Sequence, residues 1–256
     1  MRIGLIGGSA FPKDWNDWAG FRPLAQLTAQ LANCHETAYG QAASRLQGVG
    51  CGSHEVVFLA RHGQSHDLLP HEINYRANLQ ALQGARVDCV LATHTVGGID
   101  PAIGVGALVI PDQLLDYTHG RAATFGGEGN ILHVDFTQPF DAGLQVALLA
   151  AGKASALDLV AGGVYACTQG PRLETAAEVN RLERDGASLI GMTAMPEAVL
   201  ARELALPFAS ISLVVNAAAG RGDFDDASIA EAGRRGMQTL SALLLALFSD
   251  PQLFLQ

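Results

Sequence analysis

Short apolar runs that each end in a glycine-rich or polar turn constrain the fold of this chain more than any other feature. The first run, Ile3–Ile6, leads directly into Gly7-Gly8-Ser9. Similar runs follow at Val56–Ala60, Val87–Ala92, Ala107–Ile110, Leu157–Ala161, Val164–Cys167, Ser188–Ile190 and Phe208–Val215. Strands that are buried on both faces have continuous Val, Ile, Leu and Ala runs, so the pattern predicts a doubly covered, mostly parallel sheet.

Helical patterns separate several of these runs. They cover Asn74–Gln83, Glu174–Asp185, Pro196–Ala205 and approximately Ser228–Phe248. Proline at the first helical position and again just beyond the end, as at Pro196 and Pro207, is typical of helix boundaries. Because no repeat, low-complexity tract or linker interrupts the pattern, we predict one α/β domain over residues 1–256, with helices flanking the sheet.

Composition excludes several classes of protein. Hydrophobic residues make up 49% of the chain and charged residues 16%, which is the opposite of a disordered composition. The net charge of −9 and the absence of basic runs argue against a general nucleic-acid surface. The first residues lack a long apolar h-region with a cleavage site, so no signal peptide is expected. No apolar run is long enough for a membrane helix, and the four scattered cysteines form no C-x-x-C pair. We therefore expect a cytoplasmic protein without a metal site or redox motif.

Polar clusters at the predicted strand ends indicate an anion site. Gly7-Gly8-Ser9 can direct backbone N–H groups and a hydroxyl at a phosphate, although such a turn is often only a strand exit. Arg61 can bind phosphate through its guanidinium fork with His62 beside it, but a surface ion pair is the simpler alternative. An Arg-His-Gly sequence also occurs in phosphoryl-transfer enzymes with a histidine nucleophile, which the rest of the chain fits poorly. Since ligands of such sheets bind beyond the strand ends, several clusters there together favour a phosphate site.

The motifs, in order and spacing over nearly the whole chain, resemble the methylthioadenosine phosphorylase branch of the trimeric purine nucleoside phosphorylases. The motifs are Ile6–Ser9, Arg61–His66 with Asn74–Asn78, Ile110–Gln113, His133–Phe136, Gln169–Arg172 and Gly191–Ala198. The resemblance implies a single α/β domain with a mixed, mostly parallel sheet, the nucleoside phosphorylase fold, in a homotrimer. It also implies an enzyme that splits an N-glycosidic bond with inorganic phosphate as co-substrate and without any metal or organic cofactor.

The family's binding residues carry over onto matching positions of this chain. The resemblance implies that phosphate is held by Ser9, Arg61, His62, His94, Thr95 and Thr193. At the His94 position the family often has Thr, Ser or Asn, so the contact of the Thr95 amide is the firmer expectation. Met192 is expected under the ribose. His133 matches a residue that reaches the 5′ end of the sugar in a neighbouring subunit's site.

The residues for the purine depart from the methylthioadenosine branch. That branch has Asp-x-Asp after the Phe208–Val215 run, whereas this chain has Asn216-Ala217-Ala218. Asn216 and Glu174 instead match the phosphorylases of 6-oxopurine nucleosides. A carboxylate accepts the N1–H of hypoxanthine but repels adenine N1, which is itself an acceptor. The alternatives are that Glu174 only starts the next helix and that Asn216 only forms a turn.

The expected substrate is a 6-oxopurine nucleoside with a 5′-methylthio group, so the expected reaction is phosphorolysis of 5′-methylthioinosine. Asn216 is expected to stabilise the departing purine, while Arg61 and His62 hold the phosphate. Leu173 and Ile229 are expected to contact the substrate, Ile229 at the methylthio group. An inosine or guanosine phosphorylase, a methylthioadenosine phosphorylase and a nucleoside-binding sensor remain as alternatives.

Overall fold

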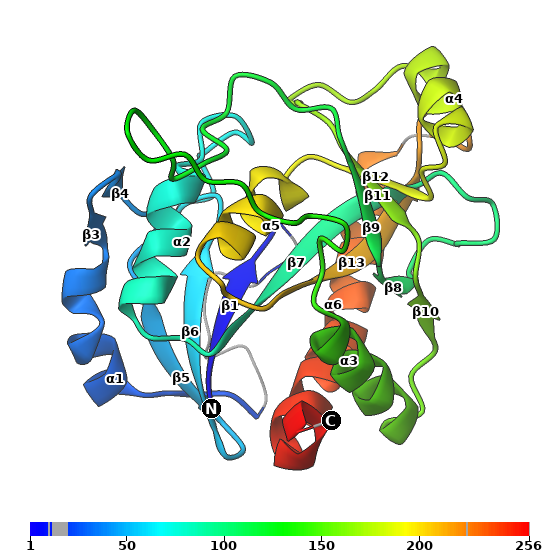
Figure 1. Ribbon diagram of the computed structural model, residues 1–256. Coiled ribbons are helices and arrows are strands. Elements are labelled where there is room, and N and C mark those ends of the chain that lie inside the picture. The colour runs from blue at the N-terminus through cyan, green and yellow to red at the C-terminus, as the bar shows by residue number, and fades with distance from the viewer. Residues whose placement is uncertain (10, 12–19, 224, 256) are drawn as a thin grey trace.

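The computed structural model describes residues 1–9, 11, 20–223 and 225–255 of this chain. Within them, an 11-stranded mixed sheet forms the centre of the molecule, with eight strands in the order β10-β8-β13-β7-β1-β6-β5-β2 (Figure 1). The central pairs β6–β1, β1–β7 and β7–β13 are parallel. The remaining strands β9, β11 and β12 attach to β7 through β12, which runs antiparallel to it. The expectation of a mixed, mostly parallel sheet in one α/β domain is confirmed.

The strands of this sheet are β1 (Arg2–Gly7), β2 (Arg22–Pro23), β5 (Gln47–Cys51), β6 (His54–Ala60), β7 (Cys89–Gly98), β8 (Leu108–Ile110), β9 (Gln113–Asp116), β10 (Leu159–Ala161), β11 (Val164–Cys167), β12 (Leu189–Gly191) and β13 (Phe208–Ala217). A separate hairpin pairs β3 (Glu36–Thr37) with β4 (Gly40–Gln41). The helices are α1 (Ala25–Gln30), α2 (Tyr75–Gly84), α3 (Ala142–Ala154), α4 (Ala176–Arg184), α5 (Ala194–Glu203) and α6 (Asp226–Ser249), with short 3-10 turns η2 (Ala32–Cys34) and η3 (Pro251–Leu255).

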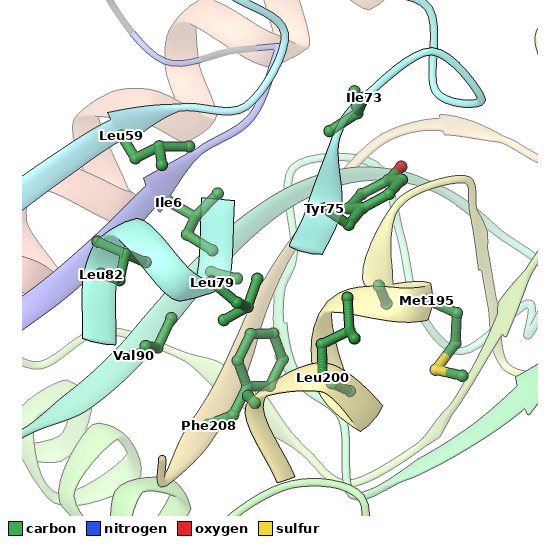
Figure 2. Close-up of a cluster of buried hydrophobic side chains, with 14 of the residues drawn as sticks. Ile6, Leu59, Ile73, Tyr75, Leu79, Leu82, Val90, Met195, Leu200 and Phe208 are labelled. Carbon is green, nitrogen blue, oxygen red and sulfur yellow. The ribbon is translucent and has the colours of Figure 1, made fainter. Parts of the chain in front are cut away.

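Alternate residues of the central strands supply two hydrophobic cores on opposite faces of the sheet. In β7, Val90 packs with α2 and α5 on one face, while Leu91 packs with α3 and α6 on the other. Figure 2 shows part of the first core, where Leu79 of α2 and Leu200 of α5 lie close to Phe208 of β13. Covering on both faces explains why the central strands read as continuous apolar runs.

One predicted loop is strand in the structure. Thr93 to Gly98 were expected to follow a strand that ended at Ala92, but β7 continues to Gly98 and pairs with β13 over this stretch. The polar side chains are tolerated because they are bonded inside the protein: Thr93 Oγ1 donates to the Ile6 carbonyl and accepts from the Gly8 N–H. The extended strand therefore carries polar groups from the core to the edge where the site lies.

The structure also allows a search for membrane-spanning helices and for metal sites. Among the described residues, no helix combines the length and apolar character needed to cross a bilayer. The same residues include no group of three or more His, Cys, Asp or Glu side chains placed to hold a metal ion.

Candidate active site

A cavity of about 590 Å³ opens where β1, β6, β7, β12 and β13 end or bend. Its wall includes almost all of the residues predicted to bind phosphate or nucleoside: Ser9, Arg61, His62, Thr95, Leu173, Glu174, Met192, Thr193, Asn216, Ala217, Ala218 and Ile229. These residues are far apart in the sequence. Ser9, Arg61 and Asn216 come from the ends of the parallel strands β1, β6 and β13. Met192 and Thr193 follow β12, which pairs antiparallel with the end of β7 and so returns to the same place.

Arg61, directly after β6, occupies the deepest part of this wall. Its side chain is 1% exposed and pairs with the buried carboxylate of Glu197, with Nε donating to Oε1 over 2.6 Å and Nη2 to Oε2 over 2.9 Å. Burial by itself would lower the pKa of Arg61, but Glu197 overcomes this and holds the pKa above its ordinary value. The surface ion pair considered for Arg61 is therefore wrong: the pair is buried, and it keeps the guanidinium charged.

Arg61 has little freedom to move. Nη1 donates to the Thr93 carbonyl over 2.8 Å, and Nη2 lies 2.9 Å from His94 Nε2. A guanidinium has five N–H groups, and these contacts with Glu197, Thr93 and His94 use four. One N–H on Nη1 remains for an anion in the cavity. Gly8 must be glycine for this packing, because a Cβ there would lie 2.6 Å from the Thr93 oxygen and 2.9 Å from Arg61 Nη1.

His94 lies behind Arg61 and does not line the cavity. Its Nδ1 is 3.1 Å from Ser210 Oγ and its Nε2 faces Arg61, so both ring nitrogens have partners inside the protein. Burial, followed by the charge of Arg61, lowers the pKa of His94 well below the usual range, and the ring is neutral. The 3.4 Å contact with Glu197 is consequently not an ion pair. The structure does not give His94 the direct phosphate contact that was predicted, because no ring nitrogen is free.

His62 does reach the cavity. Its Nδ1 lies 2.8 Å from the Leu68 carbonyl, an acceptor, so this nitrogen carries the hydrogen and Nε2 has the free lone pair. Burial and then the charge of Arg61 lower the pKa of His62 to about 4. A neutral His62 can accept a hydrogen bond from a protonated phosphate oxygen. Thr193 adds a hydroxyl: it precedes α5 as the N-cap, but its side chain makes no capping hydrogen bond.

The other end of the cavity has the groups expected to meet a purine. A bulge between Val214 and Asn216 shifts the pairing of β13 with β7, and beyond it Asn216 and Ala217 line the cavity. Asn216 Nδ2 donates one hydrogen to the Ala217 carbonyl over 2.7 Å, which leaves a second N–H and the amide oxygen. Asn216 therefore lies within a strand, and the alternative of a simple turn residue is wrong.

Glu174 lines the cavity from the connection between β11 and α4. The alternative that Glu174 starts the helix is contradicted, because Thr175 is the N-cap of α4 and forms a capping box with Glu178. Glu174 instead accepts a 2.6 Å hydrogen bond from Thr168 Oγ1. Glu174 thus lines the cavity with one carboxylate oxygen bonded to the protein.

Sequence reasoning did not single out Arg121. This side chain donates to the carbonyls of Met192, Met195 and Gln169 over 2.7, 2.6 and 2.9 Å. It therefore ties the connection after β9 to the segments around Met192 and before Glu174. Glu197 and Thr168 were also missed as partners. Glu197 stands inside the quoted Gly191–Ala198 motif, whereas no local pattern distinguishes Arg121 or Thr168.

His133 is exposed and does not line the cavity of its own chain. Its neighbours Ile131 and Leu132 are 81% and 39% exposed, an uncommon position for large apolar side chains. The expectation that His133 acts in a neighbouring subunit's site stays a prediction.

Comparisons with known proteins agree with this geometry. The chain matches the Phosphorylase superfamily over residues 19–249. It is 48% identical over 234 residues to a protein of Pseudomonas syringae pv. tomato named probable S-methyl-5′-thioinosine phosphorylase, covering 90% of this chain and 95% of that one. It is 43% identical over 192 residues to the 6-oxopurine nucleoside phosphorylase of Pyrococcus furiosus, covering 72% of each. The structure of methylthioadenosine phosphorylase from Schistosoma mansoni in complex with adenine superposes with a TM-score of 0.83 at 27% identity, covering 97% of this chain and 91% of that one.

Proposed function

This chain belongs to the phosphorylase superfamily, and we propose that it is a purine nucleoside phosphorylase that converts 5′-methylthioinosine and phosphate into hypoxanthine and 5-methylthioribose 1-phosphate. One observation carries the proposal: Arg61 and His62 line the same cavity as Glu174 and Asn216. The proposed anion site and the proposed site for an oxo-substituted purine therefore belong to one cavity. The names of the relatives support this reaction.

Phosphate binding is assigned to one end of the cavity. The free N–H of Arg61 and the hydroxyls of Ser9 and Thr193 donate to phosphate oxygens, and the Thr95 segment of β7 closes the site. The proposed role of His62 is to accept the phosphate hydroxyl through Nε2. His94 and Glu197 act through Arg61, which they hold in place.

Catalysis follows from orientation and electrostatics. The glycosidic bond lengthens and the sugar becomes oxocarbenium-like, while the bound phosphate lies on the face of the sugar opposite the purine. Negative charge then develops on the purine, and the remaining N–H of Asn216 donates to the ring. Glu174 accepts the N1–H of hypoxanthine. Phosphate is a co-substrate, and the proposed reaction requires no metal or organic cofactor.

The proposed oligomer concerns the end of the cavity where the sugar is expected to bind. Met192, Leu173 and Ile229 line the cavity and offer apolar surface to the ribose and the 5′-methylthio group. We propose a homotrimer in which His133 of one subunit completes this end in the next. The four cysteines are all unpaired, which fits a protein of the reducing cytoplasm.

A substrate panel tests the function. Release of free base is measured with and without phosphate from methylthioinosine, methylthioadenosine, inosine and guanosine. We expect phosphate-dependent cleavage with the highest kcat/KM for methylthioinosine. Phosphate-independent release would indicate a nucleosidase, no release a binding protein, and a preference for inosine or guanosine an ordinary 6-oxopurine phosphorylase.

Mixed oligomers test the role of His133 in trans. Arg61→Ala and His133→Ala chains are produced separately and by co-expression. If His133 acts in the adjacent subunit, some sites of the mixed trimer have both native side chains, so co-expression restores part of the activity that each variant lacks. Activity no higher than the average of the two variants would contradict the assignment.

A further inference from the structure

A hydrogen bond joins Thr168 to Glu174, one of the residues that line the cavity. Thr168 directly follows β11, and its Oγ1 donates to Glu174 Oε1 over 2.6 Å. Gly191 O, at 3.4 Å, is a second acceptor within reach of the hydroxyl, but the Thr168 backbone N–H already donates to it over 2.8 Å. A hydroxyl has a single hydrogen, so that hydrogen belongs to Glu174.

The hydrogen bond from Thr168 fixes one oxygen of Glu174. Because Oε1 is engaged with Thr168, Oε2 is the oxygen left to meet a ligand at the cavity wall. A carboxylate oxygen accepts hydrogen bonds and donates none. It matches the N1–H of a 6-oxopurine, whereas N1 of a 6-aminopurine is also an acceptor and finds no donor there.

We propose that Thr168 is a positioning residue that sets the base specificity of this site by holding the Glu174 carboxylate in one orientation. The proposal rests on the function proposed above and deepens it. It assigns discrimination between 6-oxo and 6-amino bases to the pair of Thr168 and Glu174, with Asn216 meeting the rest of the ring. An unpaired polar group facing the wrong base makes such discrimination large.

Local structure allows the side chain to be changed without moving the backbone. The Thr168 backbone is bonded on its N–H side to Gly191 and on its carbonyl side to Arg121. The helix after Glu174 has its own cap in Thr175 and Glu178. Thr168→Val therefore removes the hydroxyl and keeps the shape, Thr168→Ala removes it without any crowding, and Thr168→Ser keeps it.

The experiment measures kcat/KM for methylthioinosine and methylthioadenosine at one pH in the native protein and in each variant. In Thr168→Val and Thr168→Ala, we expect the ratio of the two values to fall by roughly 10- to 100-fold, the effect of losing a hydrogen bond to a charged group. Thr168→Ser should restore the native ratio.

Thr28→Val is the matched control. Thr28 Oγ1 accepts from the Gly48 N–H far from the cavity, so its loss should change stability and leave the base ratio unaltered. A ratio within about twofold of the native one in Thr168→Val and Thr168→Ala, or equal losses for both substrates, would overturn the inference while the proposed function stands. If the native protein shows no preference for the 6-oxopurine, the proposed function itself fails.

Discussion

The two ends of the cavity are built differently. At the phosphate end, Arg61, His94 and Glu197 are 1%, 2% and 0% exposed and are bonded to one another inside the core. At the nucleoside end, Leu173 is 50% exposed and Glu174 is only half-buried, in the connection between β11 and α4. The anion site is thus part of what keeps the protein folded, whereas Leu173 and Glu174 of the base site lie in a connection at the surface.

The sharpest test of this contrast is the buried ion pair. Glu197→Ala leaves the Arg61 charge buried without a carboxylate, so the free energy of unfolding should fall by about 3–5 kcal/mol in urea titrations. The control Glu231→Ala removes an exposed carboxylate bonded to Arg234 and Arg235 and should change stability little. Equal effects of the two substitutions would contradict a core role for the anion site.

At the nucleoside end, a substitution is expected to lower the rate of catalysis and to leave the free energy of unfolding almost unchanged. Asn216→Ala removes the donor assigned to the departing purine, so kcat for methylthioinosine should fall by about 10²–10³-fold. The midpoint of urea unfolding should stay close to that of the native protein, since the Asn216 side chain donates to its strand neighbour Ala217 and to no other described residue. Unchanged turnover would exclude Asn216 from the mechanism.

Acid should lower the free energy of unfolding through His62 at the phosphate end of the cavity. The pKa of His62 is about 4 in the folded protein, below the usual value of 6.5, so the unfolded chain binds the proton more tightly. The contribution of neutral His62 to the free energy of unfolding is therefore complete above about pH 6.5 and is lost as the pH falls towards 4. For His62 alone, the free energy of unfolding should be about 2 kcal/mol lower at about pH 5 than at about pH 7. Urea titrations at both values should show a smaller difference in His62→Asn; the same difference in both proteins would contradict this sign.

The smallest expected effect is a change in the preference between methylthioinosine and methylthioadenosine. Asn216→Asp combined with Ala218→Asp creates the acids of the methylthioadenosine branch at two positions of the cavity wall. Cleavage of methylthioadenosine relative to methylthioinosine should rise by roughly 10-fold, the value of one hydrogen bond to a charged group. Kinetics with both nucleosides measure this ratio. If it does not rise, Asn216 and Ala218 do not select the base.

Local pattern was sufficient for most of the sheet and for part of the helices. The runs at Ile3–Ile6, Val56–Ala60 and Phe208–Val215 lie within β1, β6 and β13. Helix α3 was not predicted, because Ala142–Ala154 is apolar on most sides and lacks a clear period. The end of β7 was misjudged for a related reason: Thr93 and His94 look like loop residues until their buried partners are known.

The sequence by itself determined the family, the α/β class and many of the residues that line the cavity, because motifs at strand ends are local and the sheet brings such ends together. Only the tertiary structure decided how those residues are held. Glu197 bonds Arg61 across 136 positions of the chain, and Arg121 bonds Met192 across 71. Such contacts depend on distances in the folded protein, and no spacing along the chain encodes them. The same holds for His94, whose place behind Arg61 follows from the packing of β7 against β13.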